Sequence, residues 1–217
     1  MTILAVETST PEGSLVIGSL QADGLKVLAE EKWNKRSSHS DVVTTSLQRA
    51  LEKAGVDLTQ MTHFAVDVGP GSFTGVRVGL NLVKSLAYSL SKPVLSINSL
   101  ELLAFQNLKD GQSALVAIKA IQNLYYFSGV SYLNGSLVTT LAPTSGTIDE
   151  IKKHLSDYTK VLIEGEPGTP PLTPHAKDLA LMAAKGGSHC VFHSWQTVKP
   201  LYVRGSEAEE KLKKVSK

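Results

Sequence analysis

The sequence predicts an α/β protein in which one unit, three strands followed by a helix, a strand and a helix, occurs twice. Short apolar runs separated by hairpin signals alternate with segments of helical spacing along the chain. The same order of elements appears in both halves, although no residue-level repeat is visible. The 217 residues are also enough to bury a substantial core.

Composition narrows the class of protein. Hydrophobic residues make up 42% and charged residues 19%, which excludes a disordered tail, a coiled coil or a collagen-like fibre. A net charge of +2 argues against a strongly basic nucleic-acid binder but is compatible with a local basic patch. The single Cys190 excludes an internal disulfide and indicates a reducing compartment. No apolar run approaches about 20 residues and no signal peptide is visible. We therefore expect a cytoplasmic protein that does not contact membranes.

The first half contains five expected strands and three expected helices. Residues 22–24 are a hairpin signal between the second and third strands. A helix begins after Ser38 or Ser40, where a serine side chain can cap it, and ends at Gly55. A second helix follows the glycine-rich turn, and Ser99 is expected to cap a third. The strands are expected at residues 3–6, 14–19, 25–31, 64–68 and 93–97, and the second and third helices at 74–90 and 100–107.

The second half repeats this order after a polar boundary at residues 109–112, so we expect lobes at 1–108 and 109–217. The dipeptide Asn134-Gly135 is a strong hairpin signal. Four prolines and two glycines make residues 164–174 a loop, and the charge-rich run 207–217 is expected to be a solvated tail. Strands are expected at 114–118, 124–132, 136–142 and 160–163, and helices at 147–155 and 176–185.

The most specific motif is the glycine-rich segment 69–75, which follows a buried strand and opens a helix. Free backbone N–H groups and the positive end of the helix dipole meet there, which suits an anion. The segment is neither a Walker A loop nor a dinucleotide fingerprint. A structural turn with a helix cap explains the spacing as well as phosphate binding does. The phosphate-binding candidates in this segment are Gly69, Gly71, Ser72 and Thr74.

A second polar corner lies at the end of the first strand. Glu7, Thr8 and Ser9 combine a carboxylate with two hydroxyls, which suits nucleotide phosphates or a hydrated magnesium ion. Hydroxyl-rich corners are also common as plain turns. His189 and His193 share a face, so a metal site is conceivable there, but a structural role is favoured. No nucleophile–base pair is present, and we expect no catalytic residue and no metal site.

The helix at 74–90 carries more apolar surface than one stripe requires. Leu82 and Leu86 widen the stripe, and Gly75 and Gly79 open a small-residue notch. Complete burial explains this excess, and so does a helix shared with a partner protein. We expect the first lobe to provide the partner surface through this helix and the one at 40–54. The candidate interface residues are Val43, Leu47, Leu51, Gly75, Gly79, Leu82 and Leu86.

Four segments together resemble the TsaB (YeaZ) family: ILAVETS at 3–9, SHS at 38–40, GPGSFTGVRVG at 69–79 and PLYVR at 200–204. The resemblance implies an actin-like, two-lobe fold of the Hsp70 and sugar-kinase (ASKHA) type. It also implies a non-catalytic scaffold in the bacterial complex that forms threonylcarbamoyladenosine beside the anticodon of ANN-decoding tRNAs. The implied partners are a TsaD-like paralogue and a TsaE-like ATPase, with tRNA reached through the complex.

The resemblance further implies that the chain has no cofactor of its own, that ATP or ADP binds at the partner interface, and that the chain homodimerises when alone. The chain departs from the family pattern at Glu7, where Asp is usual. Lys119 and Ile121 stand where the family has an Asp-Ala-Arg segment, so no nucleotide contact is carried over to that segment. A stand-alone actin-like ATPase or phosphotransferase using the Glu7 and 69–75 corners is the alternative. A protease is not supported by any residue set.

Overall fold

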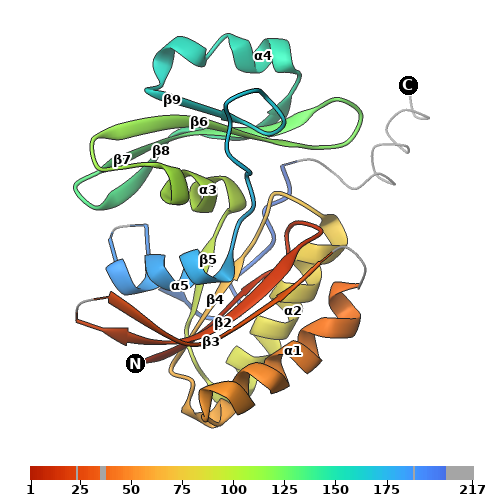
Figure 1. Cartoon of the computed structure of the whole chain (residues 1–217), viewed down its shortest axis with the longest axis vertical. Helices are drawn as coiled ribbons and strands as arrows, with labels where there is room; N and C mark the ends of the chain where they lie inside the picture. Colours follow the sequence, from red (N-terminus) through yellow and green to blue (C-terminus); the bar gives the residue numbers. More distant parts are fainter. Residues whose placement is uncertain (23, 35–37, 188, 204–217) are drawn as a thin grey trace.

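The computed structural model describes residues 1–22, 24–34, 38–187 and 189–203 (Figure 1). The charged run 207–217, expected to be a solvated tail, and Arg204 of the family motif lie outside the described residues. Within the described part of the chain, no helix is long and apolar enough to cross a membrane.

Two mixed sheets form the framework of the protein (Figure 1). The first has the order β10-β5-β4-β1-β2-β3 and the second the order β8-β7-β6-β9. In each sheet a meander of three strands is extended by a parallel strand, β4 beside β1 and β9 beside β6. The first sheet contains β1 (Thr2–Glu7), β2 (Gly13–Gln21), β3 (Gly24–Trp33), β4 (His63–Asp67), β5 (Val94–Ile97) and β10 (Phe192–His193). The second contains β6 (Gln112–Lys119), β7 (Tyr125–Leu133), β8 (Ser136–Gly146) and β9 (Lys160–Ile163).

The helices cover the sheets in layers (Figure 1). Two helices pack beneath the first sheet, two lie between the sheets, and one covers the second sheet from outside. Three hydrophobic clusters follow these layers, the largest lying between the sheets. The helices beneath the first sheet are α1 (His39–Ala54) and α2 (Phe73–Leu90). Those between the sheets are α3 (Ser99–Asn107) and α5 (Ala176–Lys185), and the outer helix is α4 (Ile148–Lys152). Single 3-10 turns occupy Leu58–Gln60 and Leu155–Asp157.

The order of elements predicted from the sequence is confirmed, including the α/β class and the duplicated unit. Asn134 and Gly135 both have positive φ, as their hairpin turn requires. Four details differ. Ser38 precedes α1, but within the described residues no serine side chain caps the helix. Asn98, not Ser99, caps α3, because its side chain accepts the N–H of Glu101. The helix expected at 147–155 ends at Lys152. The strand β10 was not predicted, because two residues carry no periodic signal.

The chain crosses between the sheets more than a simple division at residue 108 implies. The sheets change between β5 and β6, on either side of that boundary. However, α3 packs on β6 and β7 of the second sheet, whereas α5 returns to pack on β1 and β2 of the first. The strand β10 also returns and pairs with β5. Both lobes are thus held together by elements exchanged along the chain, while the boundary between two independent domains stays a prediction.

Candidate functional site

The carboxyl ends of β1 and β4 bring two acidic side chains together. The strands are parallel, with Val6 beside Val66, so Glu7 and Asp67 follow at the same edge of the sheet. Both side chains are buried. The sequence motif at 7–9 identified Glu7 but not Asp67, which ends an ordinary apolar strand. Its alignment with Glu7 depends on the strand pairing.

Ser9 links the two carboxyl groups, and Ser99 also binds Asp67. Glu7 Oε1 accepts the backbone N–H of Ser9 at 2.5 Å and lies 2.6 Å from Ser9 Oγ. Ser9 Oγ is also 3.1 Å from Asp67 Oδ2. Asp67 Oδ1 accepts the N–H of Gly69 at 2.7 Å and the hydroxyl of Ser99 at 2.8 Å. Within the described residues, Glu7 Oε2 is buried without a hydrogen-bond partner.

This arrangement favours a proton held between Glu7 and Asp67. Ser9 Oγ has one hydrogen to share between the two carboxyl groups, so a proton on one carboxyl would supply the second hydrogen bond. Burial, and then the charge of Asp67, raises the pKa of Glu7 well above its ordinary value. Burial raises the pKa of Asp67 to about 6. The pair therefore holds a proton at pH values at which exposed carboxylates have lost theirs.

The third residue of the corner, Thr8, ties β1 to α2. Its hydroxyl donates to the carbonyl of Gly75 at 2.8 Å and accepts the N–H of Gly79 at 3.2 Å. A Cβ at Gly75 would collide with Thr8 O, and one at Gly79 with Thr8 Oγ1. The notch formed by Gly75 and Gly79 is therefore filled by Thr8. The expectation that Gly75 and Gly79 belong to a partner interface is wrong, because both glycines face β1.

The two loops proposed to hold phosphate are bonded to each other. The N–H of Ser72 donates to Ser9 O at 2.7 Å, and a Cβ on Gly71 would collide with the same carbonyl. Ser72 Oγ accepts the N–H of Gly75 at 3.1 Å and so caps α2. A turn with a helix cap thus accounts for Gly71, Ser72 and Gly75. Nucleotide binding by this corner stays a prediction, with Ser72 and Thr74 exposed and Glu7 buried.

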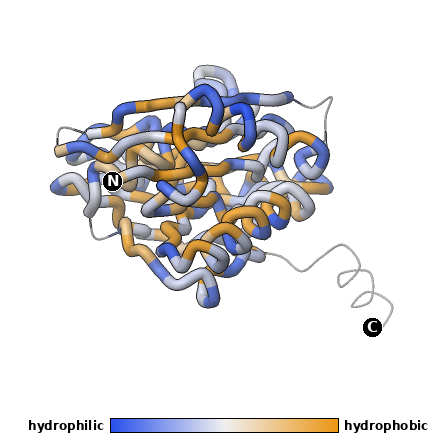
Figure 2. Tube along the Cα trace, turned by 90° about the horizontal axis from the view of Figure 1, so that it is seen from below, coloured by the Kyte–Doolittle hydropathy of each residue, from blue (hydrophilic) through white to orange (hydrophobic). Residues whose placement is uncertain are grey.

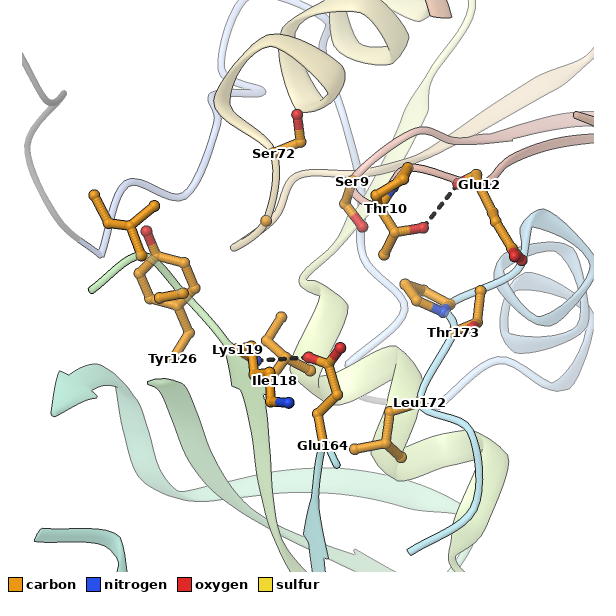
Figure 3. A pocket seen from close by; sticks show the side chains of 15 residues that line it. Ser9, Thr10, Glu12, Ser72, Ile118, Lys119, Tyr126, Glu164, Leu172 and Thr173 are labelled. Atoms are coloured by element: carbon orange, nitrogen blue, oxygen red, sulfur yellow. Dashed lines mark hydrogen bonds between the residues drawn. The ribbon is translucent and has the colours of Figure 1, made fainter. Parts of the chain in front are cut away.

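A cleft of about 470 Å³ opens between the lobes beside this corner (Figure 3). Ser9, Thr10 and Glu12 line it from the first lobe, and Lys119 and Glu164 face them from the ends of β6 and β9. One oxygen of Glu164 accepts the backbone N–H of Lys119 at 2.6 Å. Sequence reasoning noted Lys119 only as a departure from the family pattern. It missed Glu164, because the proline-rich loop after β9 carries no site motif.

The candidate interface residues divide into two groups. Val43 and Leu47 of α1 are buried in the core beneath the first sheet, and Gly75 and Gly79 are buried against Thr8. These four residues position the helices but offer no surface, which corrects the expectation for them. The residues that retain exposed surface at the edge of that core are Leu51, Leu82 and Leu86.

Two histidines, His39 and His189, have structural hydrogen-bond partners. His39 Nδ1 accepts the indole N–H of Trp33 at 2.8 Å, so its Nε2 carries the proton and donates to Thr10 O at 2.7 Å. His189 Nδ1 accepts the N–H of Leu137, and burial lowers the pKa of His189. Among the described residues, no group of three or more histidine, cysteine or acidic side chains is arranged to hold a metal ion.

Comparison with known proteins identifies the family. The family profile described as "TsaD: tRNA N6-adenosine threonylcarbamoyltransferase" matches residues 26–209. The chain belongs to the family that this profile describes, and its named relatives include TsaB proteins. The tRNA threonylcarbamoyladenosine biosynthesis protein TsaB of Haemophilus influenzae is 33% identical over 132 residues, 60% of this chain and 54% of that protein. TsaB of Bacillus subtilis is 38% identical over 104 residues, 48% of this chain and 44% of that protein. The matched segments thus span about half the length of these relatives.

The family's fold extends over almost the whole chain. The crystal structure of a Pseudomonas aeruginosa protein with similarity to peptidase YEAZ matches with a TM-score of 0.74. The match covers 94% of this chain and 99% of that one, at 20% sequence identity. At this identity the likeness establishes the fold alone. It confirms the predicted two-lobe α/β architecture.

Proposed function

We propose that this chain acts in the synthesis of threonylcarbamoyladenosine in tRNA, as the non-catalytic partner of a TsaD-type threonylcarbamoyltransferase. Relatives named for this biosynthesis support the pathway, and the match to the TsaD profile supports a paralogue of the same fold as partner. In this proposal a TsaE-type ATPase joins the pair and tRNA is bound by the complex. The chain has no cofactor of its own, and ATP or ADP is held at the interface with the partner.

The observation that carries the proposal is the closed corner at Glu7. The N–H of Ser72 is used by Ser9 O, and Thr8 is used by α2, so the groups that would hold phosphate in a stand-alone ATPase serve the fold. Among the described residues, no metal-ligand cluster replaces them. A supporting role suits this chemistry better than the alternative of an independent ATPase or phosphotransferase.

The proposed pairing surface is the flank of α2 next to α1. Leu82 and Leu86 lie one turn apart on that flank, and Leu51 of α1 is close to the same core. Each is partly buried within the chain, and a partner would cover the remainder. Since a paralogue of the same fold presents an equivalent pair of helices, four helices can pack together, burying roughly 800 Å² per partner. The same face allows a homodimer when the partner is absent.

Charge substitution on this flank tests the pairing. Leu82→Lys or Leu86→Lys should abolish assembly with a co-expressed TsaD-type paralogue, because an unpaired buried ammonium costs about 3 kcal/mol or more. Assembly is measured by co-purification and by size-exclusion chromatography with light scattering. The matched control is Val138→Lys, which changes an apolar side chain 46% exposed on β8 of the second lobe. If the two flank variants fold and assemble like the parent, the interface lies elsewhere.

A further inference from the structure

The opposite flank of α2 is overlaid by the chain's own segment 194–203, which contacts the helix at both ends. Aromatic rings and cationic side chains lie together along this contact, some of them exposed and some partly buried. We call it the aromatic–basic strip and define it as Phe73, Arg77, Lys84 and Tyr88 of α2 with Trp195 and Tyr202 of the segment.

At the amino-terminal end of α2 the strip is a stacked trio. The Arg77 guanidinium lies 3.8 Å from the centre of the Phe73 ring, and its Nε donates to the Tyr202 hydroxyl at 2.7 Å. The rings of Phe73 and Tyr202 stack with their centres 5.1 Å apart. Phe73 is nevertheless 39% exposed and Tyr202 46% exposed. These rings are held in place by one another and still present surface to solvent.

The carboxyl-terminal end repeats the chemistry. Lys84 Nζ donates to the carbonyl of Val198 at 2.8 Å and lies 6.0 Å from the centre of the Trp195 ring. The Tyr88 ring packs edge-to-face on Trp195, with centres 5.0 Å apart. Tyr88 is 66% exposed, more than any other large apolar or aromatic side chain in the described part of the chain. The second cation thus lies about two turns beyond Arg77, and the second exposed ring about four turns beyond Phe73, along α2.

Among the residues that the structure describes, no salt bridge neutralises the positive charge of the strip. Residues 68–100 include Arg77, Lys84 and Lys92 but no acidic residue, and residues 179–203 contain none either. Within the described ranges, no ion pair involves Arg77 or Lys84. On α1, by contrast, Arg49 and Lys53 both pair with Glu31. The overall charge of +2 therefore hides a local patch of one sign.

We propose that the aromatic–basic strip binds single-stranded RNA. Arg77 and Lys84 supply charge for phosphates, and the exposed rings supply stacking surfaces for bases, which is the combination that single-strand-binding proteins use. An acidic protein would satisfy the cations but would leave the rings without flat partners. The 18 residues of α2 extend over about 27 Å, which accommodates several nucleotides. The strip lies on the flank of α2 away from Leu82 and Leu86, so this inference goes beyond the proposed pairing.

Binding of a labelled RNA of about 12 nucleotides to the full chain, followed by fluorescence anisotropy, tests the proposal. The double variant R77Q/K84Q should weaken binding about tenfold and reduce the slope of log K against log salt by about two. Tyr88→Leu keeps an apolar contact with Trp195 but removes a stacking surface, and it should weaken binding about fivefold or more. Circular dichroism confirms that each variant is folded.

The matched control is K152Q/K153Q, which removes two exposed lysines at the end of α4 in the other lobe. It should bind the RNA like the parent. Three results would each overturn the proposal. They are equal losses of affinity in the two double variants, parental affinity in Tyr88→Leu, and no binding by the parent in about 50 mM salt. So would binding of polyglutamate as tight as that of RNA, which would identify a site for acidic protein. Assembly with the TsaD-type paralogue is measured in a separate assay. Failure of one proposal therefore does not decide the other.

Discussion

The two lobes end the same strand pair in opposite ways. In the first, β1 and β4 finish at Glu7 and Asp67, two like charges buried together. In the second, β6 ends at Lys119 and β9 is followed directly by Glu164, a cation and an anion that line the open cleft (Figure 3). Both pairs lie at the carboxyl ends of parallel strands, although Glu164 is one residue out of register with Lys119, and their environments differ. Figure 2 views the molecule from below and shows that apolar and polar residues alternate along the chain.

The difference shows that the segment after a strand decides the chemistry of the strand's last residue. After β4 the chain turns directly into α2, whose first turns pack on Thr8 and close the corner. After β9 it continues into the proline-rich loop 164–175, and no helix covers the strand end before α5 packs on the other sheet. The first corner therefore stabilises protonated carboxyls, whereas the second leaves its charges beside solvent.

The largest expected effect comes from opening the closed corner. Gly79→Leu places a side chain where Thr8 Oγ1 lies, so it should destabilise the protein by about 3 kcal/mol or leave it unfolded. Urea unfolding followed by circular dichroism measures the change. Asn81→Leu, at an exposed position of the same helix, should stay within about 0.5 kcal/mol of the parent. A folded Gly79→Leu variant with parental stability would mean that Thr8 does not fill the notch.

A smaller effect is expected from the shared proton. Because the folded-state pKa values of Glu7 and Asp67 are raised, their contribution to stability is fully present below about pH 4. It is lost as the pH rises through about 6 and beyond. Glu7→Gln removes one titrating group, so it should reduce this fall in stability between pH 5 and 8.

Urea unfolding at a series of pH values measures this dependence. Glu12→Gln neutralises an exposed carboxylate in the turn after the same strand, and it should keep the parental pH dependence. A parent whose stability is flat from pH 4 to 8 would contradict the shared proton, and so would a Glu7→Gln variant with the parental slope.

The smallest effect is expected at the open corner. Lys119→Gln removes an exposed ammonium group. Glu164 accepts the backbone N–H of Lys119, which the substitution keeps. The free energy of unfolding should change by no more than about 0.5 kcal/mol, because an exposed charge gains little from its neighbours. The same urea series provides the measurement. A loss above about 1 kcal/mol would place Lys119 in a structural role and weaken the contrast between the two corners.

The sequence by itself determined the class of fold and the order of its elements. Alternating apolar residues, the Asn134-Gly135 turn and the helix ending at Gly55 are local signals, and each is confirmed. Local chemistry also identified the glycine-rich turn into α2 and Glu7 as a polar residue at a strand end. These features depend on residues close together in the chain, so spacing is enough to find them.

Only the tertiary structure decided which of these residues meet. Asp67 and Ser99 are remote from Glu7 in sequence and join it because β4 pairs with β1. Gly75 and Gly79 formed a notch on a helix, and only the packing of Thr8 revealed that the chain fills it. The aromatic–basic strip depends on Tyr202 returning to Arg77, across 125 positions of the chain. Burial and long-range pairing are set by the whole fold, so no local pattern contains them.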